Sequence, residues 1–105
     1  MNLLQGTLDV LVLRTLTGGP MHGYEISRAI HARTGGDLVV EYAPLYKALH
    51  RLARAKCLTA AWGATTHGRR ARYYELTARG RERLMNETGA WQRYARAVSR
   101  VLEPS

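Results

Sequence analysis

The sequence predicts a mainly α-helical fold with a small β-hairpin wing, a winged helix-turn-helix, followed by a C-terminal dimerisation helix. Residues 57–76 form two short strand-like runs around a polar loop that ends in arginines, and an amphipathic helix pattern comes directly before them. Apolar residues then continue at helical spacing almost to the chain end. A length of 105 residues corresponds to one structural unit. We expect residues 1–76 to form the winged-helix domain and residues 77–105 the dimerisation helix.

The first helix is expected from about Leu4 to Leu16 and ends at Gly18-Gly19-Pro20. Apolar residues surround most of its circumference, so we expect one side to face the core and another to face a partner chain. A second helix, His22–Arg33, carries a narrow apolar stripe and ends at Gly35-Gly36. The short apolar segment 38–40 that follows is a candidate third strand of the wing sheet.

The third helix is expected from Pro44 to Ala55, with proline at its first position. Its inward face is apolar, and its outward face is formed by Tyr46, Lys47, His50, Arg51 and Arg54. Three cations and an aromatic ring on one face are typical of a helix that enters the major groove of DNA. An ordinary solvated helix face is the alternative that the pattern leaves open.

The wing follows as two expected strands, Leu58–Trp62 and Arg72–Leu76. Because side chains alternate along a strand, Tyr73 and Tyr74 must point to opposite faces. The hydroxyl groups, the glycine and the arginines of the connecting loop suit contacts to phosphate or to the minor groove. The arginines are Arg69, Arg70 and Arg72.

The last helix is expected to begin after an N-cap at Thr77. It carries a seam with alternating spacings of four and three residues, formed by Leu84, Thr88, Trp91, Ala95, Val98 and Leu102. This spacing is a heptad pattern with one polar member. Because the small winged-helix core cannot cover the seam, it predicts pairing of two chains in a homodimer.

The formal net charge of +8 arises within one segment, Lys47–Arg83, which holds ten basic and two acidic residues. Clustered positive charge suits a polyanion through counterion release, so double-stranded DNA is the expected partner. A solvated basic face without a partner is the alternative. No membrane-spanning run is present, and the apolar N-terminus, which contains Asp9 and Arg14, is interpreted as a core helix and not as a signal peptide.

Cys57 is the single cysteine, which fits a reducing cytoplasm. With DNA as the expected partner, we expect a cytoplasmic location in association with the nucleoid. No nucleophile lies beside a base, and the histidines and Cys57 are scattered, so we expect no enzyme, no cofactor and no metal site. A redox role for Cys57 is one alternative. A winged-helix module that binds an acidic protein without specific DNA binding is the other.

Six segments, read in order, resemble the PadR family of bacterial transcriptional regulators over nearly the whole chain. They are LLQGTLDVLVLRTL, GPMHGYEI, LYKALHRLARA, LTAAWG, GRRARYYELTARGRERL and AW. The short ending after Leu102 resembles the subgroup that has one C-terminal helix. The resemblance implies a homodimer on a palindromic operator, usually a repressor, which in some members is released by a small aromatic or phenolic compound or a drug.

Pattern and resemblance together give the residues expected to contact DNA: Tyr24, Tyr46, Lys47, His50, Arg51, Arg69, Arg70 and Arg72. By the resemblance, Trp91 falls on the tryptophan that in similar drug-binding members lines a cavity at the dimer interface, opposite the first helix. The expected effector pocket or dimer interface comprises Leu3, Thr7, Val10, Trp91, Ala95 and Val98. Trp91 is either an anchor of the dimer core or a stacking platform for a ligand.

Two departures from the family pattern lie at the third helix. Pro44 takes the usual Ser/Thr position and Lys47 takes the usual proline position. The hydroxyl cap is thereby lost, so we expect a shifted or frayed helix start, and a cation is added on the DNA side. Ala95 stands where some drug-binding relatives place polar or charged groups, which weakens the case for a cationic effector.

Overall fold

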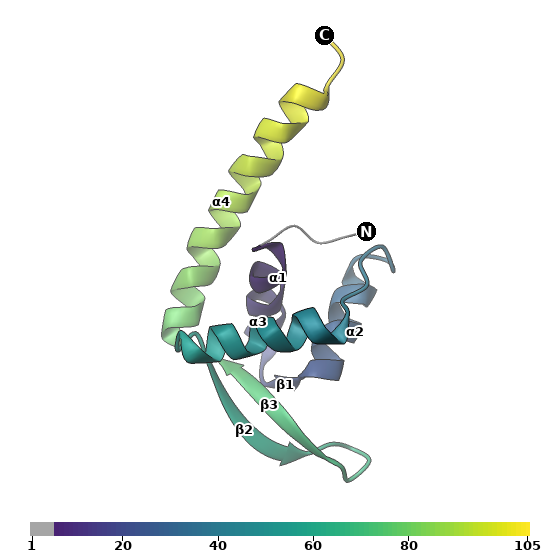
Figure 1. Cartoon of the computed structure of the whole chain (residues 1–105), viewed down its shortest axis with the longest axis vertical. Coiled ribbons are helices and arrows are strands. Elements are labelled where there is room, and N and C mark those ends of the chain that lie inside the picture. The colour runs from purple at the N-terminus through teal and green to yellow at the C-terminus, as the bar shows by residue number, and fades with distance from the viewer. Residues whose placement is uncertain (1–5) are drawn as a thin grey trace.

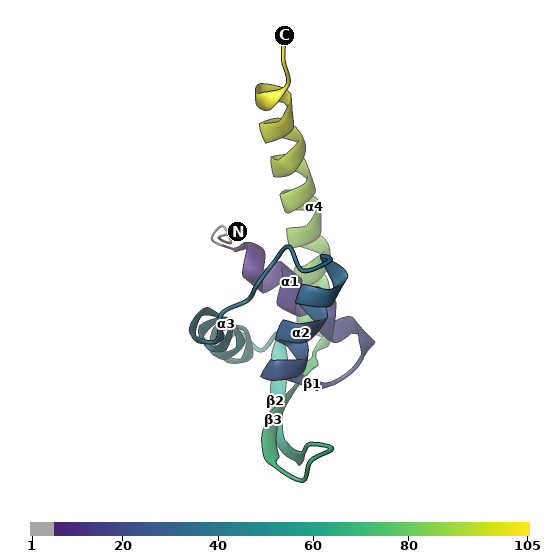
Figure 2. The same ribbon diagram turned by 90° about the vertical axis from the view of Figure 1, so that its right-hand side faces the viewer.

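The computed structural model describes residues 6–105, which contain four α-helices and a three-stranded antiparallel sheet. In chain order these are α1 (Thr7–Thr15), β1 (Met21–His22), α2 (Gly23–Arg33), α3 (Tyr42–Arg54), β2 (Leu58–Ala64), β3 (Arg70–Leu76) and α4 (Ala78–Leu102). Figures 1 and 2 show α1, α2 and α3 gathered above the hairpin of β2 and β3, while α4 extends away in the opposite direction. The expected fold class, mainly α with a small wing, is confirmed.

The first helix is shorter than expected, since α1 ends at Thr15 and a 3-10 turn, Leu16–Gly18, follows it. The expected start at Leu4, and Leu3 of the expected pocket, lie outside the described residues. Leu8, Val12 and Leu13 of α1 are buried in the core. Among residues 6–105, no helix is long and apolar enough to cross a membrane.

The third strand of the sheet is β1, so the candidate at 38–40 is wrong. Met21 pairs with Tyr74 and His22 with Tyr73, antiparallel to β3. The turn at Gly19 and Pro20 brings this short extended segment to the edge of β3, directly before α2 begins. The segment at 38–40 instead covers the core: Val40 is buried, and its carbonyl accepts a hydrogen bond of 3.3 Å from Ser27 Oγ.

α2 ends at Arg33 as predicted and begins one residue later than expected, at Gly23. His22 is its N-cap in a capping box, in which His22 Nδ1 accepts from the Glu25 amide and Glu25 Oε1 accepts from the His22 amide. At its end Gly35 adopts a φ of 62°, and the Gly36 amide donates 2.8 Å to the His31 carbonyl. This Schellman motif needs a left-handed residue, which glycine adopts without steric cost.

α3 begins at Tyr42 with Glu41 as N-cap, so the expected start at Pro44 is wrong by two residues. No side chain caps this helix, which agrees with the lost hydroxyl. Pro44 sits at the third helical position, and the first hydrogen bond of the helix is from the Leu45 amide to the Glu41 carbonyl. Proline is tolerated there because the amides of the first turn have no partner within the helix.

A second Schellman motif joins α3 to the wing. The Lys56 amide donates to the Ala53 carbonyl at 3.0 Å and the Cys57 amide to the Leu52 carbonyl at 2.9 Å. Lys56 takes the left-handed position with a φ of 65°, where glycine is usual. Leu52 and Cys57 are both buried, so an apolar contact accompanies the turn. α3 therefore passes into β2 through a short hydrogen-bonded turn at residues 55–57, which we call the joint.

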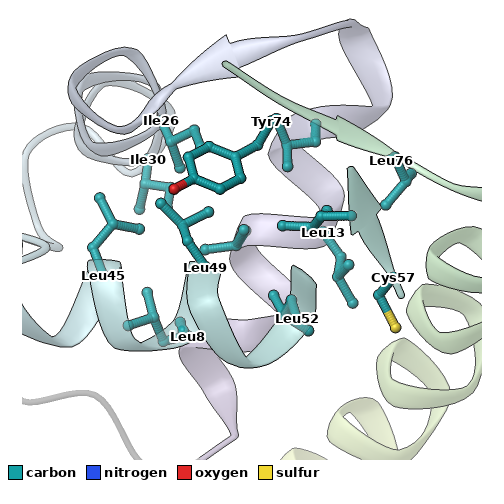
Figure 3. Close-up of a cluster of buried hydrophobic side chains, with 14 of the residues drawn as sticks. Leu8, Leu13, Ile26, Ile30, Leu45, Leu49, Leu52, Cys57, Tyr74 and Leu76 are labelled. Carbon is teal, nitrogen blue, oxygen red and sulfur yellow. The ribbon is translucent and has the colours of Figure 1, made fainter. Parts of the chain in front are cut away.

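The wing strands are longer than expected and pair from Leu58 opposite Leu76 to Ala64 opposite Arg70. Tyr73 and Tyr74 point to opposite faces, as predicted. Tyr74 is buried, and Figure 3 shows its ring beside Ile26 and Ile30. On the other face, the Tyr73 hydroxyl donates 3.1 Å to the Ala64 carbonyl.

α4 starts at the predicted cap, since Thr77 Oγ1 accepts from the Gly80 amide at 3.0 Å. The same hydroxyl donates 2.7 Å to the Lys56 carbonyl and so ties α4 to the joint after α3. Only Gly80 and Leu84 of this helix of 25 residues are buried. Beyond them the seam is uncovered: Trp91 is 45% exposed and Leu102 is 75% exposed.

Candidate nucleic-acid interface

An open cleft with a volume of about 1150 Å³ lies between α2, α3 and the wing. It brings together six of the eight residues expected to contact DNA: Tyr24, Tyr46, His50, Arg69, Arg70 and Arg72. Four arginines line it, these three and Arg28, against one carboxylate, Glu25. Glu25 is already engaged with His22 in the capping box. The cleft therefore presents an excess of positive charge.

α3 contributes an aromatic face to the cleft. Tyr42 stacks on Tyr46 with the ring centroids 5.2 Å apart, and both rings are exposed. Gly23 at the start of α2 lies beneath this face, and a Cβ there would be 3.8 Å from the Tyr46 hydroxyl oxygen. Tyr42 was not predicted as a site residue because the helix was expected to begin after it.

α2 contributes a second aromatic group. Tyr24 stacks with His22 at 6.4 Å between the ring centroids, and the Arg28 guanidinium lies 5.7 Å from the Tyr24 ring centroid. Sequence reasoning missed Arg28, although its spacing of four residues from Tyr24 places the two on one helix face. The pair presents one cation and one aromatic ring to the cleft.

Two of the three wing arginines, Arg70 and Arg72, lie against the ring of Trp62. The Arg70 and Arg72 guanidinium carbons lie 4.9 Å and 5.5 Å from the Trp62 ring centroid, and Trp62 is 58% exposed. Trp62 was expected only as the end of a strand. The sequence could have indicated its contact with arginine. Residues directly opposite each other in a hairpin share a face, and Trp62 pairs with Arg72.

Thr65 orders the loop at the wing tip. Its amide donates 2.7 Å to the Arg69 carbonyl, and its hydroxyl accepts from the Arg69 amide at 3.2 Å. Gly68 closes the turn with a φ of 77°, and its amide donates a hydrogen bond of 2.9 Å to the Thr65 carbonyl. The loop therefore carries Arg69 on an internally hydrogen-bonded turn.

Replacing Trp62 with leucine is expected to weaken DNA binding about fivefold without unfolding the protein. Two exposed cation–π contacts are together worth ~1 kcal/mol or more, and their loss frees two arginines that must then be ordered on binding. Fluorescence anisotropy with a labelled duplex measures the change. Trp62→Tyr, which keeps an aromatic ring beside Arg70 and Arg72, is the matched control and is expected to bind DNA nearly as tightly as the wild type. Equal affinity for Trp62→Leu and the wild type would contradict this role.

Two residues expected to contact DNA lie elsewhere. Lys47 is exposed on α3 but does not line the cleft. Arg51 Nη2 binds Asp9 Oδ1 of α1 at 2.6 Å, although the arginine side chain remains 59% exposed. The helical pattern placed Arg51 on the outward face, and nothing in it indicated a partner 42 residues away.

A smaller cavity of about 470 Å³ lies between α1 and α4, where the effector pocket or dimer interface was expected. It contains Thr7, Val10 and Trp91 of the expected set. Ala95 and Val98 lie farther along α4 and do not line it. Glu87 and Tyr94 line it and were not predicted, although their spacings of four and three residues from Trp91 place them on one helix face. Within residues 6–105, no group of three or more His, Cys, Asp or Glu side chains is placed to hold a metal ion.

Comparison with known proteins agrees with this geometry. A family described as the PadR-like transcriptional regulators matches residues 12–86. An uncharacterised protein of Lysinibacillus sphaericus is 28% identical over 102 residues, which cover 97% of this chain and 94% of that protein.

Two solved structures share the whole architecture. A transcriptional regulator from Clostridium thermocellum has a TM-score of 0.85 and 26% identity, with 94% of this chain and 93% of that chain covered. A PadR family transcriptional regulator from Eggerthella lenta has a TM-score of 0.78 and 28% identity, with 96% and 86% covered. With the family match spanning most of its length, the chain belongs to the PadR-like family of transcriptional regulators.

Proposed function

We propose that this regulator is a homodimeric repressor that binds a palindromic operator, with α3 in the major groove and the wing on the flanking backbone. The observation that carries the proposal is the basic cleft, in which α2, α3 and the wing offer aromatic rings and four arginines from one concave surface. Tyr46, Lys47 and His50 would face base edges and nearby phosphates. Arg69, Arg70 and Arg72 would bind the backbone beside each half-site.

The uncovered seam of α4 supports the dimer. Trp91, Val98 and Leu102 are exposed on a helix that leaves the domain core after Leu84. A run of apolar groups on one exposed helix face indicates a partner, and its heptad spacing fits a second α4. Two copies would then hold their α3 helices about 34 Å apart, one turn of DNA.

Charged residues in the seam are expected to break the dimer. Val98→Glu combined with Leu102→Glu places two acids on each chain at the contact, so like charges meet and apolar contact is lost. Sedimentation velocity should then give a monomer, with operator affinity reduced at least tenfold because one half-site remains. Arg96→Glu with Arg100→Glu, which reverses two charges outside the seam on the same helix, is the control. A dimer that survives in the seam variant would reject α4 pairing.

The cavity between α1 and α4 is the proposed effector site. The flat ring of Trp91, with Val10 and Tyr94, suits a small aromatic or phenolic compound. An effector that changes the spacing of the two winged-helix domains in the homodimer lowers operator affinity, with couplings of about 1–3 kcal/mol in typical cases. Quenching of tryptophan fluorescence by planar phenols tests the site, provided that Trp91→Ala abolishes the quenching and Trp62→Ala retains it.

A gel-shift titration tests the function as a whole. The probe is DNA from beside the protein's own gene, at two salt concentrations and with excess unrelated competitor. A shift that resists competitor and weakens with salt supports an operator-binding regulator. Binding that competitor erases points to a general DNA binder. The absence of a shift at low salt, together with a captured acidic protein whose binding depends weakly on salt, favours a protein-interaction module.

A further inference from the structure

Asp9 is a buried acid, only 6% exposed, and it holds two helices at once. Its Oδ1 binds Arg51 of α3 at 2.6 Å, and its Oδ2 binds Arg83 of α4 at 3.5 Å. An ionised carboxylate in the interior requires such partners, since an unpaired buried charge is strongly destabilising. Asp9 therefore fixes α3 relative to α4 through α1.

The contacts continue to a fourth residue. Arg83 Nε donates 2.8 Å to Glu87 Oε1, one turn along α4. The Glu87 hydrogen bond raises the pKa of the Arg83 guanidinium above its ordinary value, an effect that partial burial opposes. Positive and negative charges alternate and balance along this ion-pair chain, which consists of Glu87, Arg83, Asp9 and Arg51.

The two ends of the ion-pair chain lie at different sites. Glu87 lines the cavity between α1 and α4, and its second oxygen, Oε2, is buried without a hydrogen-bond partner among residues 6–105. Arg51 lies on α3 beside His50, which lines the cleft. A buried acceptor without a partner is costly, so a rotation of the Glu87 side chain that turns Oε2 toward the cavity would let it accept a hydrogen bond from a donor bound there.

We propose that the ion-pair chain couples this cavity to the DNA-reading helix, with Arg51 and Asp9 acting as positioning residues for α3. A donor bound at Glu87 Oε2 draws the carboxylate away from Arg83, which then competes with Arg51 for Asp9. The contact that fixes α3 against α1 loosens, and the angle between α3 and α4 is no longer held. The inference rests on the proposed DNA-binding function and adds a path by which the cavity regulates it.

Glu87→Gln tests the coupling at its cavity end. Operator affinity is expected to fall about three- to tenfold, the size of effects seen for residues that modulate coupling between sites. General electrostatics predicts the opposite, because losing an acid raises the net positive charge and tightens DNA binding. Glu82→Gln, which removes the same charge from an exposed position of α4, is the matched control and is expected to bind at least as tightly as the wild type.

Arg51 provides the second position of a double-mutant cycle with Glu87. Arg51→Met alone is expected to lower operator affinity by a similar factor, and adding Glu87→Gln to it should produce no further loss. For Glu87→Gln the loss should be confined to the operator, since binding to an unrelated duplex depends on charge and not on the angle between α3 and α4. Arg51→Met removes a cation and weakens binding to both duplexes, so only its additional loss on the operator measures the coupling. The coupling would be overturned if Glu87→Gln lowered operator affinity equally in the wild type and in the Arg51→Met background. It would also be overturned if Glu87→Gln and Glu82→Gln changed operator affinity equally.

Glu87→Asp separates geometry from charge and keeps the test decisive if the glutamine variant is unstable. It retains the negative charge but is one methylene too short to reach Arg83, so it should lower operator affinity as Glu87→Gln does. Unfolding of both variants in circular dichroism would overturn the inference, because Glu87 would then be a structural residue. Failure of the wild type to bind any duplex would instead reject the proposed function.

Discussion

Replacing Arg69 and Arg70 together with alanine is expected to weaken binding to every DNA sequence by about 30-fold for each half-site at physiological salt. Each phosphate contact contributes ~0.9 to the slope of log affinity against log salt, so losing two on each chain should reduce the slope by about 1.8 for each half-site and about 3.6 for the homodimer. The loss is uniform because backbone contacts carry no sequence information. Equilibrium titrations by fluorescence anisotropy at several salt concentrations give both quantities.

The matched control for the wing is Arg96→Ala with Arg100→Ala. It removes two arginines from the exposed part of α4, away from the cleft, and so lowers the net charge equally. We expect its salt slope to stay close to that of the wild type. If both double variants lose affinity and slope equally, general net charge and not the wing binds the backbone.

Gly80→Ala is expected to destabilise the protein by about 3 kcal/mol. A Cβ at this position would lie 2.2 Å from the Cys57 carbonyl oxygen and 2.7 Å from Leu76 Cδ1. The nearest atom is backbone, so no rotamer change relieves the clash, and α4 must move away from the joint between α3 and β2. Such overpacking costs more than the ~1 kcal/mol by which alanine otherwise favours a helix over glycine.

Gly89→Ala on the same helix is the matched control for Gly80. Among residues 6–105, a Cβ there would meet only the Arg93 guanidinium at 3.4 Å, and that flexible side chain can move. This variant is expected to gain up to about 1 kcal/mol from helix propensity. Urea denaturation at one protein concentration compares the two. If both substitutions stabilise the protein, the close contact of α4 with Cys57 is not tight in solution.

The periodic parts of the fold could be predicted from the sequence, and the exceptions have local physical causes. Glycine marks the end of α2, because Gly35 takes the left-handed position. At the end of α3 that position belongs to Lys56, a residue that gives no such signal. The start of α3 was misjudged because proline is accommodated throughout the first turn. The third strand was misjudged because a two-residue strand such as β1 is too short to show any period.

The candidate site was predictable where a local pattern creates it. The arginines of the wing, and Tyr46 and His50 on the outward face of α3, follow from local spacing, whereas Tyr42 of that face was missed. The roles of Trp62 and Asp9 depend on partners across the hairpin or on other helices, at distances of 8 to 74 residues along the chain. Arg51 shows the limit most clearly, since its position on a cationic helix face is correct but its closest partner is a buried acid.

The hydrogen-bonded joint at Lys56 has a consequence for how DNA preference changes in such regulators. Because backbone contacts set the angle between α3 and the wing, exchanges of outward side chains on either element leave that angle intact. If α3 reads the operator as proposed, single substitutions can give new operator sequences without rebuilding the scaffold. The same property makes the outward positions of α3 suitable for a combinatorial library in which DNA preference is reprogrammed.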